Sequence, residues 1–179
     1  MIEGQEVNRY DLLKCTFIIP LRIETADRMR NIITTLIYLT RNFACRIIVK
    51  EVDKESIFLR DVQPLLEQAL EPEMLESIHH IFEKSDEFTF HRTKILNDML
   101  WMVKTPVVAN YDSDIILPID SYVNATNMIS KGWVHPDAEG GQPVKVVYPY
   151  GLGEYQYQCH IGDEHATAFV NSGFNFESF

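Results

Sequence analysis

Several features that mark common classes of protein are missing from this chain of 179 residues. Only three cysteines occur, an odd number at wide spacings, which argues against the disulfide framework of a small secreted protein. No apolar run reaches the roughly 18 residues that span a membrane, and the first residues lack the basic and apolar regions of a signal peptide. The sequence therefore predicts a cytoplasmic protein without a membrane segment, whose thiols are buried and reduced.

Basic blocks and glycine signatures are also absent. The formal net charge is -10, and no Lys/Arg-rich block occurs, so we expect no nucleic-acid partner. An anionic substrate would need local Arg or Lys, or a bound cation, at its site. The glycine patterns of the P-loop, the dinucleotide fold and the nucleophile elbow are missing, which argues against those three classes of enzyme.

What the chain does contain is an alternation of apolar runs and helical periodicity. Residues 15–19 and 46–52 are short apolar runs rich in β-forming residues, typical of strands buried on both faces of a parallel sheet. Between them, from about Ala26, apolar residues recur at spacings of three and four, which predicts a helix with one buried face. This β-α-β order predicts one α/β domain over residues 1–179, with a mostly parallel sheet.

The later segments are predicted with the same rules. Residues 54–85 are charged and broken by prolines, which predicts a peripheral helical excursion with His79 and His80 on its surface. Strands are expected at 107–110 and 144–148. Helices are expected from about residue 90 to 103 and from 121 to 131, the second closed by Gly132. Beyond residue 149, glycine and aromatic residues are frequent, which suggests either a loop-rich lip over a pocket or a flank whose aromatics belong to the core.

Two clusters of charged residues are candidates for a functional site. Asp112 and Asp114 follow the strand predicted at 107–110, and two close carboxylates repel each other unless a cation or hydrogen bonds offset the cost. They indicate either a divalent-metal site or a solvated acidic turn. Arg92 and Lys94 lie at the start of a predicted helix, where positive charge opposes the helix dipole. They are either solvated or arranged to meet a phosphate at the helix N-terminus.

Four short motifs occur in a familiar order. They are Phe-Ile-Ile-Pro-Leu-Arg at 17–22, Ile-Ile-Val-Lys-Glu at 47–51, Phe-His-Arg-Thr-Lys-Ile-Leu-Asn at 90–97, and Tyr-Asp-Ser-Asp-Ile-Ile-Leu-Pro at 111–118. Together they resemble the nucleotide loop, second strand, helix start and D-x-D motif of glycosyltransferases of the GT-A fold. Within that fold, they are most similar to the β-1,4-galactosyltransferase-like and family 2 group.

The resemblance implies a Rossmann-like α/β domain of the GT-A class that uses a UDP-sugar and Mn²⁺ or Mg²⁺ to glycosylate a sugar, lipid or protein hydroxyl. Its donor-binding half would cover 14–118 and a partial acceptor side 119–179. By position, the resemblance assigns the metal to Asp112 and Asp114, Asp114 being the surer ligand. It assigns the nucleotide-sugar to Pro20, Arg22, Glu51, Asp53, Phe90, Arg92, Lys94, Asp112 and Ser113.

The sequence also departs from that group. The group's later Trp-Gly-x-Glu-Asp stretch, with its catalytic acid and a following metal-binding His, has no counterpart here. We therefore expect a chain truncated at its C-terminus, a short variant, or a module that binds nucleotide-sugar without transferring it. His160 or His165 is a candidate third metal ligand or an ordinary surface residue, and Asp163 or Glu164 a candidate base. A nucleotidyltransferase of sugar phosphates is the alternative enzyme, although residues 20–25 lack the glycine-rich loop it would need.

Overall fold

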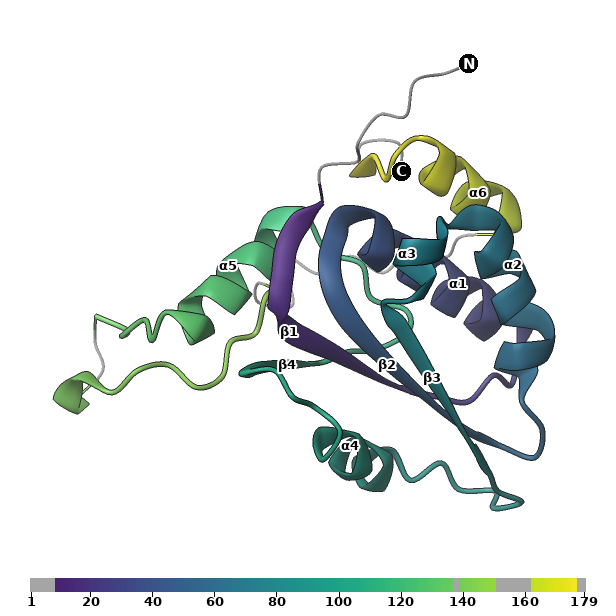
Figure 1. The fold of residues 1–179 in the computed structure, drawn as a ribbon, viewed down its shortest axis with the longest axis horizontal. Coiled ribbons are helices and arrows are strands. Elements are labelled where there is room, and N and C mark those ends of the chain that lie inside the picture. The colour runs from purple at the N-terminus through teal and green to yellow at the C-terminus, as the bar shows by residue number, and fades with distance from the viewer. Residues whose placement is uncertain (1–8, 137–138, 151–161, 177–179) are drawn as a thin grey trace.

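A computed structural model describes residues 9–136, 139–150 and 162–176, and within them the chain forms an α/β domain (Figure 1). The strands are β1 (Tyr10–Leu21), β2 (Phe43–Asp53), β3 (Ile78–Lys84) and β4 (Val107–Asn110). The main helices are α1 (Ala26–Asn42), α2 (Gln63–Ala69), α3 (Pro72–Leu75), α4 (Arg92–Leu100), α5 (Ile119–Ser130) and α6 (Asp163–Asn171). A π-helical turn, η1 (Phe58–Val62), precedes α2, and a 3₁₀ turn, η2 (Glu139–Gly141), follows α5.

The four described strands form one sheet in the order β3-β2-β1-β4, and every pairing between them is parallel. This confirms the predicted α/β class and is consistent with a Rossmann-like arrangement. The β-α-β unit also forms as predicted, with Thr25 capping α1 by accepting a hydrogen bond from the Arg28 N–H at 3.2 Å. The strands extend further than their apolar runs, since β1 begins at Tyr10 and contains Pro20.

Both faces of the sheet are covered, which explains the continuous apolar runs within β1 and β2. Phe17, Ile19 and Val49 point into the larger core under α1, α2 and α6. Ile18 and Ile48 point the other way, into a smaller core with α4. Figure 1 shows α4 on the opposite side of the sheet from α1, α2 and α6. The sheet is therefore wound on both faces.

Two predicted elements are corrected by the structure. The segment 54–85 is not wholly helical, because Ile78–Lys84 forms β3 and pairs with β2. The expected strand at 144–148 does not form, and the nearby pairing is a single antiparallel bridge between Val134 and Pro143. Val146 and Tyr148 are 69% and 73% exposed, so their β-forming side chains have no strand to pack on.

The ends of the last two helices follow glycine rules. Gly132 has φ 64° and follows Lys131, the C-cap of α5, as the sequence predicts. After α6, Gly173 has φ 72°, and the Phe174 N–H donates to the Phe169 carbonyl at 2.9 Å, which is a Schellman motif. No helix among the described residues is long and apolar enough to cross a membrane.

Candidate functional site

The candidate site lies where the sheet changes winding direction. The chain leaves β1 toward β2 by a helix on one face, and it enters β4, the other neighbour of β1, from a helix on the opposite face. Doubly wound sheets bind ligands outside the carboxyl ends of the strands at such a point. Here β1 contributes Pro20 and the residue after its end, Arg22, while β4 delivers Asp112 and Asp114.

The segment after β4 is held by buried tyrosines. The Tyr111 N–H donates to the Ile18 carbonyl at 3.1 Å, and the Tyr111 hydroxyl donates to the Ile115 carbonyl. Tyr122 contacts the Tyr111 hydroxyl and accepts from the Leu117 N–H at 2.9 Å. Because the Tyr111 proton goes to Ile115, Tyr122 is the donor between the two hydroxyls. Burial raises the pKa of Tyr122 to about 12, so its donor proton is kept.

Helix α1 holds the same segment from a second side. The Thr35 hydroxyl donates to the Ser113 carbonyl at 2.9 Å, and the Tyr38 hydroxyl donates to the Leu117 carbonyl at 2.6 Å. Both α1 residues are buried, so these bonds are shielded from water. The backbone that carries the acidic pair is thereby fixed at several points.

The two acids of this segment have different surroundings. Asp112 is half-buried and accepts a hydrogen bond from Nη2 of Arg92, the first residue of α4. The same nitrogen lies 3.4 Å from the Asn110 side-chain oxygen. Asp114 is exposed, and within the described part of the chain its carboxylate has no hydrogen bond or ion pair. The structure therefore brings together two of the predicted site residues, Arg92 and Asp112.

The other cations near the site have distinct positions. Arg22 is only 6% exposed and donates from Nε to the Val52 carbonyl and from Nη1 to the Phe88 carbonyl, each at 2.9 Å. Its guanidinium lies 5.3 Å from the centre of the Phe90 ring. Arg22 thus fixes the loop before α4, whereas Lys94 is exposed on the first turn of α4. Residues 90–94 line a shallow hollow of about 370 Å³.

Glu51 lies at the same edge of the sheet but is closed to solvent. It is fully buried, and its carboxylate accepts from the Ser56 hydroxyl at 2.6 Å and from the N–H groups of Ile57 and Phe58. His80 Nε2 lies 3.1 Å from the same carboxylate, and its ring stacks on Phe58 with centroids 4.1 Å apart. In this structure Glu51 holds the turn after β2. The sequence predicts His80 on the surface, and this prediction is wrong because His80 is half-buried.

The remaining candidate residues make their hydrogen bonds and ion pairs with groups other than Asp112 and Asp114. Asp53 ends β2, and its carboxylate accepts from the Lys54 N–H at 2.7 Å. Asp163, in the first turn of α6, forms an ion pair with Arg30 at 2.8 Å. Glu164 and His165 are exposed on the same helix, where His165 Nδ1 lies 3.4 Å from the Gly162 N–H as part of the helix cap. His160 lies outside the described residues.

The donor set suits a hard divalent cation with few protein ligands. Among residues 9–136, 139–150 and 162–176, no cluster of three or more Cys, His, Asp and Glu side chains is placed to hold a metal. The accessible pair Asp112 and Asp114 supplies carboxylate oxygens, and Mg²⁺ or Mn²⁺ commonly takes one or two carboxylates with substrate phosphates and water. The residues therefore fit a metal that a phosphorylated ligand helps to bind.

Sequence reasoning missed the partners that hold this edge together. The alternation of Ile78, His80 and Phe82 with other residues is a weak strand signal that could have placed His80 in the sheet. No local signal links Tyr38 to Tyr111 and Tyr122, because Tyr38 lies on α1, far from both in sequence. Comparison with known proteins adds no family to this description. The sequence matches no protein-family model, and no curated protein matches it significantly.

Proposed function

We propose that the chain is a GT-A-type domain that binds a UDP-sugar as its nucleoside-diphosphate sugar and transfers the sugar to an acceptor hydroxyl with the help of Mn²⁺ or Mg²⁺. The observation that carries the proposal is the position of Asp112 and Asp114 at the end of β4, beside β1, where the winding of the sheet reverses. The other three motifs that resemble GT-A glycosyltransferases, at 17–22, 47–51 and 90–97, give further support.

The start of α4 is suited to receive the diphosphate. His91 occupies the N-cap position without a side-chain cap, and the first turn contains Arg92 and Lys94 but no acid. The Arg92 N–H donates to the Phe90 carbonyl at 2.9 Å, and the next N–H groups of the first turn, with the positive end of the helix dipole, favour an anion there. Arg92 already contacts Asp112, so one side chain joins the phosphate side of the site to the metal side.

The charges of the metal ion and the diphosphate suggest separate roles for the two aspartates and the two arginines of the site. A divalent cation would be held by Asp112 and Asp114 and would stabilise charge on the departing nucleoside diphosphate. In the present structure Arg92 neutralises Asp112. When cation and diphosphate bind together, we expect Arg92 to turn from Asp112 toward a phosphate oxygen, since two cations on one carboxylate repel each other. Arg22 stays buried and keeps Phe90 in place.

Calorimetric titration of UDP tests the proposal, first with Mn²⁺ and then with EDTA. We expect binding that requires the metal, and Asp114→Ala to weaken it by at least about 100-fold while the free energy of unfolding changes by less than about 0.5 kcal/mol. Glu71→Ala removes an exposed acid elsewhere and serves as the control. Equal UDP binding by wild type and Asp114→Ala would refute the site assignment.

Transfer activity needs a second measurement. A working active site should release UDP slowly from UDP-glucose or UDP-galactose in the presence of Mn²⁺, with water as the acceptor. A module that only binds the donor would give the titration signal without this release. Glu164→Gln tests the exposed candidate base, and Asp163→Asn tests the one that Arg30 engages. Release unchanged in both variants would remove α6 from the catalytic machinery.

A further inference from the structure

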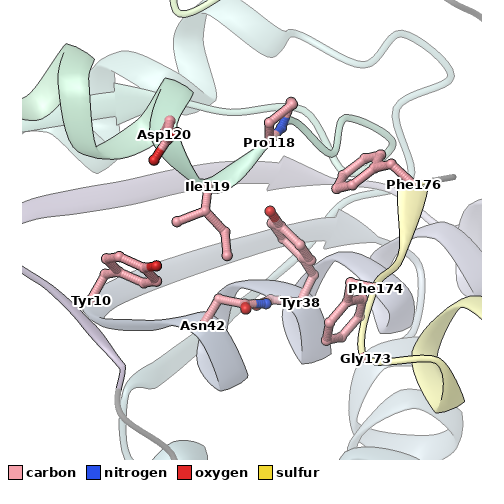
Figure 2. A pocket seen from close by; sticks show the side chains of 9 residues that line it. All are labelled: Tyr10, Tyr38, Asn42, Pro118, Ile119, Asp120, Gly173, Phe174 and Phe176. Atoms are coloured by element: carbon pink, nitrogen blue, oxygen red, sulfur yellow. The ribbon is translucent and has the colours of Figure 1, made fainter.

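A second pocket lies at the other end of the sheet from the acidic pair. It has a volume of about 310 Å³ and opens beside the first residue of β1, the last residue of α1 and the start of α5 (Figure 2). Asp112 and Asp114, by contrast, follow the carboxyl end of β4. The volume of the second pocket falls at the lower end of the range for small-molecule sites, about 300 to 1,000 Å³. The pocket is therefore separate from the site of the proposed transfer.

The pocket offers ring faces to a ligand. Tyr10 and Phe176 are 48% and 42% exposed, and Figure 2 shows them at opposite sides of the pocket. Tyr38 and Phe174 form the floor, where their rings meet edge to face with centroids 4.9 Å apart. Phe174 has φ 65°, a strained conformation for a bulky residue. The chain thus accepts a strained backbone at a position that builds this pocket.

The polar groups of the pocket are hydrogen-bond acceptors and hydroxyls. Asp120 is exposed, and within the described residues its carboxylate has no hydrogen bond or ion pair. Asn42 donates from Nδ2 to the Tyr38 carbonyl at 2.9 Å, which leaves its side-chain oxygen to accept. The Tyr10 hydroxyl can donate or accept. A ligand that carries several hydroxyl donors would satisfy these groups.

Charge and ring geometry narrow the class of ligand. Among the described residues that line the pocket there is no Lys, Arg or His, and Asp120 is negative, so these residues would repel a phosphate or nucleotide. A quaternary ammonium group prefers several ring faces around it. Here Tyr38 and Phe174 are 1% and 8% exposed and packed on each other, so they cannot offer a cage. A wholly apolar ligand would leave the Asp120 carboxylate desolvated without a partner.

We propose that this pocket is a saccharide-binding site, in which Tyr10 or Phe176 stacks on the C–H face of a neutral sugar while Asp120 and Asn42 accept hydrogen bonds from its hydroxyl groups. The negative face of an aromatic ring attracts the polarised C–H hydrogens of a sugar. A charged acceptor oxygen in the same pocket makes stronger bonds to hydroxyl donors than a neutral oxygen would. The proposal does not depend on the transferase activity, because no metal or nucleotide takes part, and neither Asp112 nor Asp114 lines the pocket.

Saturation-transfer NMR with lactose, cellobiose, maltose and di-N-acetylchitobiose tests the site, in EDTA and without nucleotide. We expect at least one of these probes to bind wild-type protein, and Tyr10→Ala and Asp120→Asn each to weaken that binding by about tenfold. Tyr10→Phe keeps the ring and should retain most of the affinity. Tyr148→Ala removes an exposed ring outside the pocket and should leave binding unchanged.

Two outcomes would overturn the proposal. One is that none of the four sugars binds; Tyr10-dependent binding of choline in that case would assign the pocket to a cation instead. The other is that a sugar binds equally well to wild type, Tyr10→Ala and Asp120→Asn. Since EDTA is present throughout, a failed UDP titration leaves this result unaffected, and failure here leaves the donor site standing.

Discussion

Glu51 and Asp112 lie at the same edge of the sheet, Glu51 near the end of β2 and Asp112 just beyond the end of β4, yet they occupy opposite environments. Glu51 is fully buried, and four groups of its own chain bond its carboxylate. Asp112 is 45% exposed and has one long, movable partner in Arg92. Position at the carboxyl edge therefore does not by itself make an acid a ligand. An acid can bind a ligand only where oxygen lone pairs remain accessible.

The largest expected effect tests the buried side of this comparison. Glu51→Ala should lower the free energy of unfolding by about 3 kcal/mol, because the N–H groups of Ile57 and Phe58 and the Ser56 hydroxyl lose their acceptor inside the protein. Urea denaturation measures the change. Glu76→Ala removes an exposed acid and should stay within about 0.5 kcal/mol of wild type. Similar values for both variants would show that Glu51 is not structural.

The pH dependence of stability gives a second test of the structural role of Glu51. Burial raises the pKa of Glu51, but hydrogen bonds from His80, Ser56 and the Phe58 N–H together outweigh burial and bring the pKa below its ordinary value of 4.5. A lowered folded-state pKa stabilises the protein above the unfolded-state pKa, and this contribution is lost as the pH falls through the folded value. The stability difference between wild type and Glu51→Gln should therefore be constant near neutrality and shrink below pH 4.5. A difference that widens in acid would contradict this assignment.

A smaller change in the free energy of unfolding is expected from Tyr122, which holds the segment that carries Asp112. Tyr122→Phe removes the hydroxyl that donates to Tyr111 and accepts from the Leu117 N–H, which should cost about 1–2 kcal/mol of stability. Metal-dependent UDP binding should weaken as well, because the segment that carries Asp112 and Asp114 is less firmly held. Tyr148→Phe changes an exposed hydroxyl and is the matched control. If the two variants are equally stable, the tyrosine network does not hold the segment.

The smallest change in stability is expected at Arg92, on the exposed side of the comparison. Its ion pair with Asp112 is 45% exposed on both sides, so Arg92→Ala should change the free energy of unfolding by less than about 0.5 kcal/mol. The same variant should weaken UDP binding by about tenfold, since a charge-assisted bond to phosphate is lost. Lys104→Ala removes an equal charge from another exposed site and should bind UDP normally. Unfolding and calorimetry together separate the two effects, and normal UDP binding by Arg92→Ala would remove it from the site.

Local patterns predicted the parts of the fold that depend on neighbours in sequence. The apolar runs of β1 and β2, the periodicity of α1, the short strand β4 and the glycine after α5 all appear where the sequence places them. The prediction failed at β3, because its histidines and charged residues do not resemble a typical strand. It also failed at 144–148, where the β-forming residues have no neighbouring strand with which to pair. Strand formation in those places depends on the partner, which local composition does not describe.

The sequence by itself determined that Asp112 and Asp114 follow a strand and that Arg92 and Lys94 begin a helix. Only the tertiary structure decided which charged groups meet and which are buried. Arg92 reaches Asp112 across 20 positions of sequence, Tyr38 reaches the Leu117 carbonyl across 79, and Glu51 is enclosed by a turn and by a neighbouring strand. The same holds for the pocket between Tyr10 and Phe176, which joins both ends of the described chain. The reason is physical: periodicity records which face of an element is apolar, whereas hydrogen-bond partners and pockets depend on how the elements are packed.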